Sequence, residues 1–255
     1  MRKLEGIVRM VLGVAWVLGT SSVLVLVLLV LLPFRGARIR VCNVYGKIVS
    51  PPILWIARAN LTWHDRERIE LHKPALYISN HTSMTDIFLG MMLLPIGGVG
   101  IAKKEVAKIP FYGWAYRLSG HLLIDRSNRE TAIAGMKETA EIVKHHGMSI
   151  WVWPEGTRSR DGRMLPFKKG FAHLAIATGL PIVPVVVTNA HKNWAKHTMT
   201  AFRRTAIDVK VLEPIDTGGW TEDNLHEQIR RVEDLMAAAL PPEQRPAPRL
   251  EDGAA

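Results

Sequence analysis

Cysteine is almost absent from this chain of 255 residues, because Cys42 is the only one. A single cysteine excludes an intramolecular disulfide and fits a reducing compartment. The sequence has no Gly-x-Ser-x-Gly motif, which argues against a serine nucleophile of the hydrolase type. The histidines are scattered, so no metal site is expected, and no internal repeat is found. Apolar residues, in contrast, make up 48% of the chain, which is enough for a buried core.

The charge is unbalanced, since 33 lysines and arginines face 23 acidic residues and give a formal net charge of +10. Such a balance indicates a phosphate-bearing partner, which could be nucleic acid, an anionic membrane or a phosphorylated substrate. The net charge alone does not distinguish among these three kinds of partner.

One long apolar run, Met10–Pro33, carries no charge. It meets the roughly 20 residues that a bilayer span requires. No small-residue cleavage site follows it, so it does not read as a removable signal peptide. Both flanks are basic, and the positive-inside rule therefore gives no clear orientation. Two interpretations stay open: a single span, or a helical pair within one leaflet whose second member includes the apolar patch Ile53–Leu61.

From about Thr62 the pattern changes to short apolar runs that alternate with amphipathic stretches. Strands are expected at 75–79, 98–102, 121–125, 149–153 and 182–188, with an additional edge strand at 206–212. Helices are expected at 86–94, 111–118, 128–145, 169–178 and 225–240. A proline, Pro184, inside an apolar strand is typical of an edge position or a bulge, and we interpret the block Leu180–Val185 as one that serves packing.

This alternation predicts an α/β fold, with a mostly parallel sheet flanked by helices and an N-terminal membrane-associated helical segment. We divide the chain into an anchoring segment at 1–61, a catalytic domain at 62–240 and a disordered tail at 241–255, which is rich in proline and charge.

A histidine and an aspartate, His81 and Asp86, follow the first expected strand of that domain. The end of a strand is where α/β proteins place their sites. An imidazole can take a proton from a hydroxyl near neutral pH, and a carboxylate on its other nitrogen stabilises the resulting imidazolium. The plain alternative is a surface histidine beside a helix-capping aspartate.

Two more polar clusters follow later strands. One expected strand ends in Asp125-Arg126, and another ends in the run Trp153-Pro154-Glu155-Gly156-Thr157-Arg158. Arginine offers a planar fork suited to phosphate, and the Pro-Glu-Gly turn can present backbone N–H groups to a ligand. Taken singly, each cluster also fits a surface ion pair or an ordinary turn. Because all three follow strands, we expect them to meet at one edge of the sheet.

These residues give the chain its likeness to known proteins. Four blocks stand in the order Asn80–Asp86, Gly120–Arg126, Trp153–Ser159 and Leu180–Val185. In this order they resemble the motifs of the glycerolipid acyltransferase family, within it the bacterial 1-acyl-sn-glycerol-3-phosphate acyltransferases. The similarity extends over roughly 71–216. Trp153 stands where the family usually has phenylalanine, and Leu123 where many members do.

The resemblance implies a role for each matching position. His81 is expected to be the general base and Asp86 its partner. The acceptor's phosphate and glycerol are expected to be bound by Arg126, Glu155, Gly156, Thr157 and Arg158, with Lys103 or Lys104 as a further phosphate contact. No cofactor and no metal are implied.

The implied reaction is transfer of a fatty acyl group from acyl-CoA or acyl carrier protein to the sn-2 hydroxyl of lysophosphatidic acid, giving phosphatidic acid. The implied location is the bacterial inner membrane, among membrane lipids, with the catalytic domain facing the cytoplasm. Another lysolipid, such as lyso-ornithine lipid, is the nearest alternative acceptor. A nucleic-acid-binding protein fits the charge but not the apolar run. A non-catalytic membrane scaffold fits neither His81 nor Asp86.

Overall fold

The computed structural model describes residues 2–108, 112–124, 129–194 and 200–248. Within them, one seven-stranded sheet has the order β1-β7-β6-β2-β5-β3-β4. Its strands are β1 Ala59–His64, β2 Leu76–Ser79, β3 Val99–Lys103, β4 Leu122–Ile124, β5 Ile150–Val152, β6 Ile182–Val187 and β7 Thr205–Val211. Five of these, from β6 to β4 in the sheet, run parallel; β7 pairs antiparallel with β6, and β1 runs parallel to β7.

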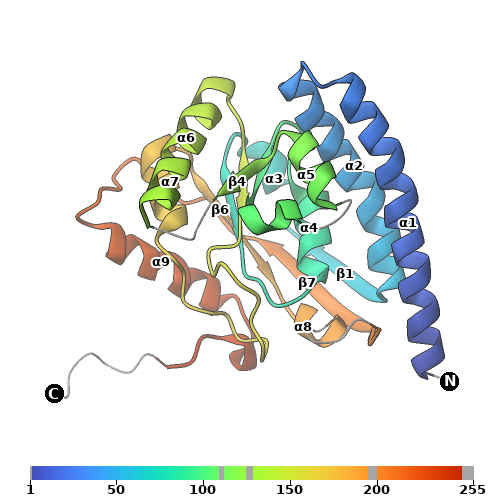
Figure 1. Ribbon diagram of the computed structural model, residues 1–255. Coiled ribbons are helices and arrows are strands. Elements are labelled where there is room, and N and C mark those ends of the chain that lie inside the picture. Colours follow the sequence, from blue (N-terminus) through green and yellow to red (C-terminus); the bar gives the residue numbers. More distant parts are fainter. Residues whose placement is uncertain (1, 109–111, 125–128, 195–199, 249–255) are drawn as a thin grey trace.

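Helices cover both faces of the sheet (Figure 1). They are α1 Arg2–Val30, α2 Arg35–Ile56, α3 Arg68–Leu71, α4 Thr85–Leu93, α5 Tyr112–Ser119, α6 Arg129–His146, α7 Gly170–Thr178, α8 Ala190–Asn193 and α9 Leu225–Ala238, with 3-10 turns η1 Lys104–Lys108 and η2 Pro242–Gln244. One core cluster joins the sheet to α6, α7 and α9. A second joins the other face to α2, α3 and α4. The predicted α/β fold, with its mostly parallel sheet, is confirmed.

The edge position considered for Pro184 is wrong, because β6 lies inside the sheet between β7 and β2. Every residue of β6 is buried, as expected for a strand covered on both faces. The Pro184 carbonyl accepts the Leu212 N–H at 2.9 Å, one residue beyond the end of β7. The missing N–H of the proline therefore falls where the ladder to β7 ends, and an internal strand tolerates it.

The boundary near residue 61 also differs from the prediction. The apolar patch 53–61 contains the end of α2 and the start of β1, a strand that the sequence pattern did not indicate. Pro51 and Pro52 lie inside α2, near its end. The burial of β1 alternates, with its half-buried residues Ala59, Leu61 and Trp63 packed on the second core cluster. The N-terminal segment thus contributes a strand to the catalytic sheet as well as two helices.

The two N-terminal helices form an antiparallel pair along one side of the molecule (Figure 1). Residues 4–30 of α1 are long and apolar enough to cross a membrane, and most of this surface is exposed. The Trp16 indole donates to the Val49 carbonyl at 3.2 Å, and the Arg9 guanidinium donates to the Ile56 carbonyl at 3.0 Å. These contacts hold α1 against α2 along its first half.

Polar contacts attach α2 to the catalytic domain. The buried Asn43 amide donates to the Gly98 carbonyl at 3.0 Å and accepts the Gly97 N–H at 2.8 Å. Lys47 donates to the Met92 carbonyl at 3.2 Å, and Arg35 donates twice to the Gly120 carbonyl. Because these bonds are spread along α2, this helix is part of the domain as well as of the N-terminal helix pair.

The residues after Pro241 are ordered as far as 248, contrary to the expected disordered tail. Gln244 is buried, and its backbone carbonyl accepts the Met164 N–H at 2.9 Å. Its side chain accepts the Asn189 N–H at 2.8 Å. The composition of this segment suggested disorder, but one glutamine provides enough hydrogen bonds to fix it. Residues 249–255 lie outside the described part of the chain.

Candidate active site

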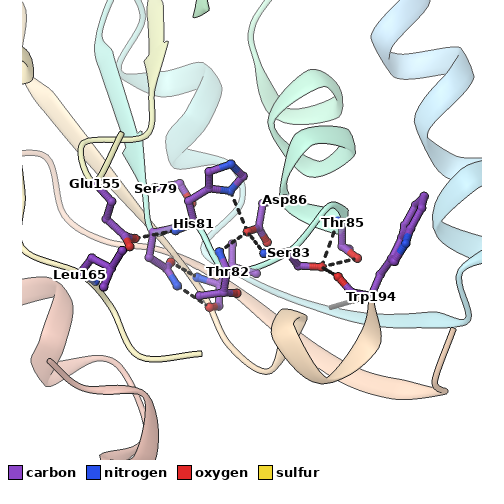
Figure 2. A network of polar contacts seen from close by, with 11 residues as sticks. Ser79, His81, Thr82, Ser83, Thr85, Asp86, Glu155, Leu165 and Trp194 are labelled. Atoms are coloured by element: carbon purple, nitrogen blue, oxygen red, sulfur yellow. Dashed lines mark hydrogen bonds and ion pairs between the residues drawn. The ribbon is translucent and has the colours of Figure 1, made fainter. Parts of the chain in front are cut away.

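His81 and Asp86 form a buried pair at the carboxyl end of β2. Asp86 lies in the first turn of α4, and its Oδ2 is 3.0 Å from Nδ1 of His81 (Figure 2). The same oxygen accepts the backbone N–H groups of Thr82 and Ser83 at 2.6 and 2.8 Å. A carboxylate only accepts, so Nδ1 of His81 is the donor. Nε2 is then the ring nitrogen left to take a proton.

Burial differs between the two partners in a way that suits this chemistry. The Asp86 side chain is 1% exposed, whereas that of His81 is 12% exposed. A helix N-terminus and two backbone donors stabilise the Asp86 charge away from water. The imidazole alone remains accessible. The two residues that the sequence predicted to pair are therefore in hydrogen-bond contact, in the arrangement that a general base with an orienting carboxylate would require.

The backbone of His81 is held by the loop that follows β5. Its N–H donates to Oε1 of Glu155 at 2.7 Å, and its carbonyl accepts the Ser159 N–H at 2.8 Å. The second oxygen of Glu155 accepts the Leu165 N–H at 3.0 Å (Figure 2). Glu155 is 1% exposed. Both of its oxygens thus bind protein backbone, so the geometry gives Glu155 a bracing role between His81 and the 156–165 loop.

Burial raises the pKa of Glu155 to about 8, against the lowering effect of its two backbone donors. The negative charge of Asp86 raises it further. A buried carboxyl near a second carboxylate is a costly arrangement unless it is hydrogen-bonded. The two backbone N–H groups meet that requirement.

The indole of Trp153 supports the ring of His81. The two ring centroids are 4.7 Å apart and the planes are inclined by 21°. Gly90, one turn into α4, permits this position, because a Cβ there would come within 3.0 Å of the Trp153 ring and 2.9 Å of the Trp151 Nε1. The sequence drew attention to Trp153 only as a departure from the family pattern, and it gave no signal for Gly90.

Arg158 is half-buried in the same loop. Burial lowers its pKa, while the negative charge of Asp86 raises it, so the guanidinium lies within electrostatic reach of the His81–Asp86 pair. Gly156 adopts a left-handed conformation with φ of 70°, which lets the chain turn directly after Glu155. Thr157 is exposed at that turn. The predicted convergence of the first and third clusters is therefore observed, because His81 follows β2, Glu155 and Arg158 follow β5, and these two strands are neighbours in the sheet.

The other predicted contacts are placed only in part. Lys103 ends β3 at the same edge of the sheet, and Lys104, which is exposed, begins η1. Arg126 lies outside the described residues; β4, which precedes it, ends at Ile124. His121 accepts the Gly100 N–H at 3.2 Å, and burial lowers its pKa to about 4. A neutral, hydrogen-bonded His121 has a structural role in this block.

An apolar groove lies beside this site. It is lined by α1, α2 and α4 together with Trp194 and Phe202, which pack edge to face with ring centroids 4.9 Å apart. Phe88, in the same helix as Asp86, stacks on Trp194 at 6.3 Å. Phe88 and Trp194 thus connect the apolar groove to the helix that carries Asp86.

The sequence model of the acyltransferase family matches residues 60–188, which is half of the chain and includes β1 through β6. The chain belongs to the acyltransferase family. The matched residues include His81, Asp86, Glu155 and Arg158.

Named relatives agree with this membership. The chain is 44% identical to 1-acyl-sn-glycerol-3-phosphate acyltransferase from Limnanthes douglasii, over 91% of this chain and 82% of that protein. It is 36% identical to the Escherichia coli protein of the same name, over 66% of this chain and 71% of that one. The crystal structure of the 1-acyl-sn-glycerophosphate acyltransferase from Thermotoga maritima matches with a TM-score of 0.69 at 25% identity, covering 91% of this chain and 94% of that one. The acyltransferase fold and class expected from the sequence are confirmed.

Proposed function

We propose that this acyltransferase moves a fatty acyl group from a thioester donor to the sn-2 hydroxyl of 1-acyl-sn-glycerol-3-phosphate, giving phosphatidic acid. The observation that carries the proposal is the His81–Asp86 pair, whose histidine is hydrogen-bonded through its carbonyl to Ser159, the neighbour of the half-buried Arg158. A hydroxyl to be activated and a phosphate to be bound are the two functional groups that such an acceptor presents. The names of the relatives support the same acceptor.

In the proposed mechanism, Nε2 of His81 takes the proton of the acceptor hydroxyl as its oxygen attacks the thioester carbonyl. Asp86 stabilises the imidazolium on the Nδ1 side. The tetrahedral intermediate then expels the thiolate, which receives the proton from Nε2. The products are the ester and the free thiol, and His81 is neutral again. The acceptor oxygen is itself the nucleophile, so this route needs no acyl-enzyme.

We further propose that the phosphate of the acceptor binds at Arg158, with Arg126 and Lys103 or Lys104 as additional contacts. Gly156 and Thr157 form the turn that presents Arg158 and can offer backbone or hydroxyl groups to the glycerol. Glu155 is buried with both oxygens engaged, so we assign its contribution to the loop rather than to the glycerol. The apolar groove between α1, α2 and α4 is the natural place for an acyl chain, since its lining is apolar.

For the membrane segment we propose a helical pair that enters one leaflet, with the catalytic domain on the cytoplasmic side. α2 is hydrogen-bonded to the domain from Arg35 to Lys47, and α1 packs along α2. If α1 crossed the bilayer perpendicular to its plane, α2 and the domain bonded to it would be drawn into the bilayer as well. A helix pair that enters only one leaflet does not bury the polar surface of the domain in this way. Cysteine labelling at the 31–34 turn from each side of sealed vesicles tests this placement; labelling from the opposite side only would contradict it.

The function is tested by assaying the purified chain in detergent with 1-acyl-sn-glycerol-3-phosphate and, separately, lyso-ornithine lipid. Acyl-CoA and acyl carrier protein thioesters serve as alternative donors. Phosphatidic acid should form, and His81→Ala should lower kcat by roughly 10²–10⁴-fold, the usual value of a general base. Asp86→Asn should also lower kcat. Full activity in His81→Ala would disprove the proposed role of His81 as the base. If product formed from lyso-ornithine lipid alone, that lipid would be the acceptor in place of 1-acyl-sn-glycerol-3-phosphate.

A further inference from the structure

Asn193, the last residue of α8, makes a fully satisfied set of hydrogen bonds inside the protein. It is 0% exposed. Its Nδ2 donates to the Ala57 carbonyl at 2.8 Å and to the Arg203 carbonyl at 2.7 Å. Its Oδ1 accepts the hydroxyl of Thr85 at 2.9 Å. Two carbonyl partners require the amide nitrogen on their side, so the contacts fix the orientation of the side chain.

These partners come from three separate parts of the chain. Ala57 is the C-cap residue directly after α2, Arg203 precedes β7, and Thr85 begins α4. The backbone N–H of Arg203 also donates to the Asn193 carbonyl at 3.0 Å. One side chain thus joins the end of a membrane helix, a loop at the sheet edge and the helix that carries Asp86.

Thr85 connects this junction directly to the catalytic turn, because it precedes Asp86. The neighbouring Ser83 provides a second connection. Its hydroxyl donates to the Trp194 carbonyl at 2.7 Å, and its Oγ accepts the Thr85 N–H at 3.1 Å (Figure 2). The Ser83 N–H meanwhile holds Oδ2 of Asp86. Ser83 and Thr85 are both 0% exposed, so water does not substitute for these bonds.

We propose that Asn193 is a positioning residue for acyl transfer, which acts through Thr85 to fix Asp86, and therefore His81, relative to the end of the membrane helix α2. The inference rests on the proposed role of His81 as the base. It adds a function for a residue that lies outside all four sequence blocks. A misplacement of about 1 Å in a catalytic group can cost on the order of 10²-fold in rate, so such a tie has a measurable effect.

An asparagine that only stabilised the fold would, when replaced, lower the melting temperature without lowering kcat. Asn43 provides a matched control of this kind. Asn43 is also buried, at 2% exposed, and its amide also bonds backbone groups, at Gly97 and Gly98. It joins α2 to the loop before β3, and its side-chain hydrogen bonds among the described residues go to Gly97 and Gly98 rather than to the turn that carries Asp86. Asn43→Ala therefore removes a comparable buried network at a distance from the catalytic turn.

The experiment compares Asn193→Ala, Thr85→Val, the double variant, Thr85→Ser and Asn43→Ala in the detergent assay, with His81→Ala alongside. Melting temperature and folded fraction are measured for each. Thr85→Val is the key single change, because it keeps the shape of the side chain and removes only the hydroxyl.

Asn193→Ala and Thr85→Val should each lower kcat by about tenfold, with little change in KM. The double variant should be no worse than the more damaged single, because both changes break one connection. Thr85→Ser should recover most of the activity, and Asn43→Ala should lose melting temperature while kcat stays within about twofold.

Two results would overturn the inference, and they are distinguishable. If His81→Ala is inactive but Thr85→Val keeps its kcat, or if the losses of the two single variants multiply, Asn193 has no positioning role and the proposed base stands. If His81→Ala stays active, the proposed function fails, and the positioning role fails with it. Should Asn193→Ala not fold, the Thr85 variants alone decide the question.

Discussion

The imidazole of His81 lies almost flat on the indole of Trp153, 4.7 Å away between ring centroids. The ring that we propose as the base is therefore held in two ways, by Asp86 at Nδ1 and by the aromatic face of Trp153. Replacing Trp153 with alanine should lower kcat by about tenfold, because the imidazole gains freedom to rotate away from Asp86. Trp153→Phe retains an aromatic face and should retain most of the activity. Equal kcat for the two variants would show that the stacking has no catalytic value.

Gly90 should prove intolerant of even a methyl group. A Cβ at this position would lie 3.0 Å from the Trp153 ring and 2.9 Å from Nε1 of Trp151, so one of the indoles must move. We expect Gly90→Ala to lower kcat several-fold and to reduce the melting temperature by a few degrees, as overpacking costs about 1–3 kcal/mol.

Gly135→Ala in α6 is the matched control for Gly90. Its Cβ would meet Ile124 at an ordinary 3.9 Å. The change should leave kcat intact and, by helix propensity, stabilise the chain by about 0.5–1 kcal/mol. A Gly90→Ala variant that behaves like Gly135→Ala would contradict the packing argument.

Glu155 should make the stability of the protein depend on pH. Burial raises its pKa from 4.5 to about 8, so the folded protein holds a proton that the unfolded chain has already released. The stabilising contribution of this group is fully present below about pH 4.5 and is lost as the pH rises through about 8. Glu155→Gln does not titrate. The melting temperature of the native protein should therefore fall relative to that of Glu155→Gln between about pH 5 and 9. Parallel curves, or a relative rise, would show that the pKa is not raised.

Gln244 should influence the binding of the acceptor from the far end of the chain. Its side chain accepts the Asn189 N–H at 2.8 Å and lies against the Gly162 carbonyl in the loop that also contains Arg158. Gln244→Ala should loosen that loop and raise the KM for the lysolipid by about three- to tenfold, with a smaller effect on kcat.

The neighbouring Glu243 provides the control for this change. It is exposed and forms only a long ion pair with Lys192 at 3.8 Å among the described residues. Glu243→Ala should leave both constants unchanged. If Gln244→Ala lowers kcat but not KM, the C-terminal segment does not act through the Arg158 loop.

Much of the fold could be read from the sequence, because the relevant signals are local. The alternation of apolar runs located the strands from β2 to β7 and most of the helices. β1 escaped because its apolar residues continue the apolar end of α2, and no turn residue marks the change. The internal position of Pro184 depends on where β7 ends, which is a tertiary fact. The order at Gln244 depends on partners at Met164 and Asn189, which no local composition reveals.

The sequence indicated which chemical groups meet at the site, but it did not indicate most of the contacts that hold them in place. His81 and Asp86 were singled out because their block stands in order with three others that together resemble the motifs of the family, whereas their spacing alone left a surface histidine beside a capping aspartate equally open. The roles of Trp153, Gly90 and Asn193 come from contacts between segments as distant as residues 85 and 193. Glu155 illustrates the limit well. Its motif suggests a ligand contact, whereas only the geometry shows that both oxygens bind the backbone.

The attachment of α2 has a practical consequence for anyone preparing this enzyme. Leu54 of α2 belongs to the same core cluster as Leu89 and Val185, and a Cβ at Gly46 would come within 2.5 Å of the Met91 carbonyl. Cutting the chain after the helix pair would uncover an apolar wall of the catalytic domain and remove the Asn43 and Ala57 contacts. Truncation is therefore a poor route to a water-soluble version. Replacing the exposed leucines and valines of α1 with polar residues, while leaving α2 intact, is the better one.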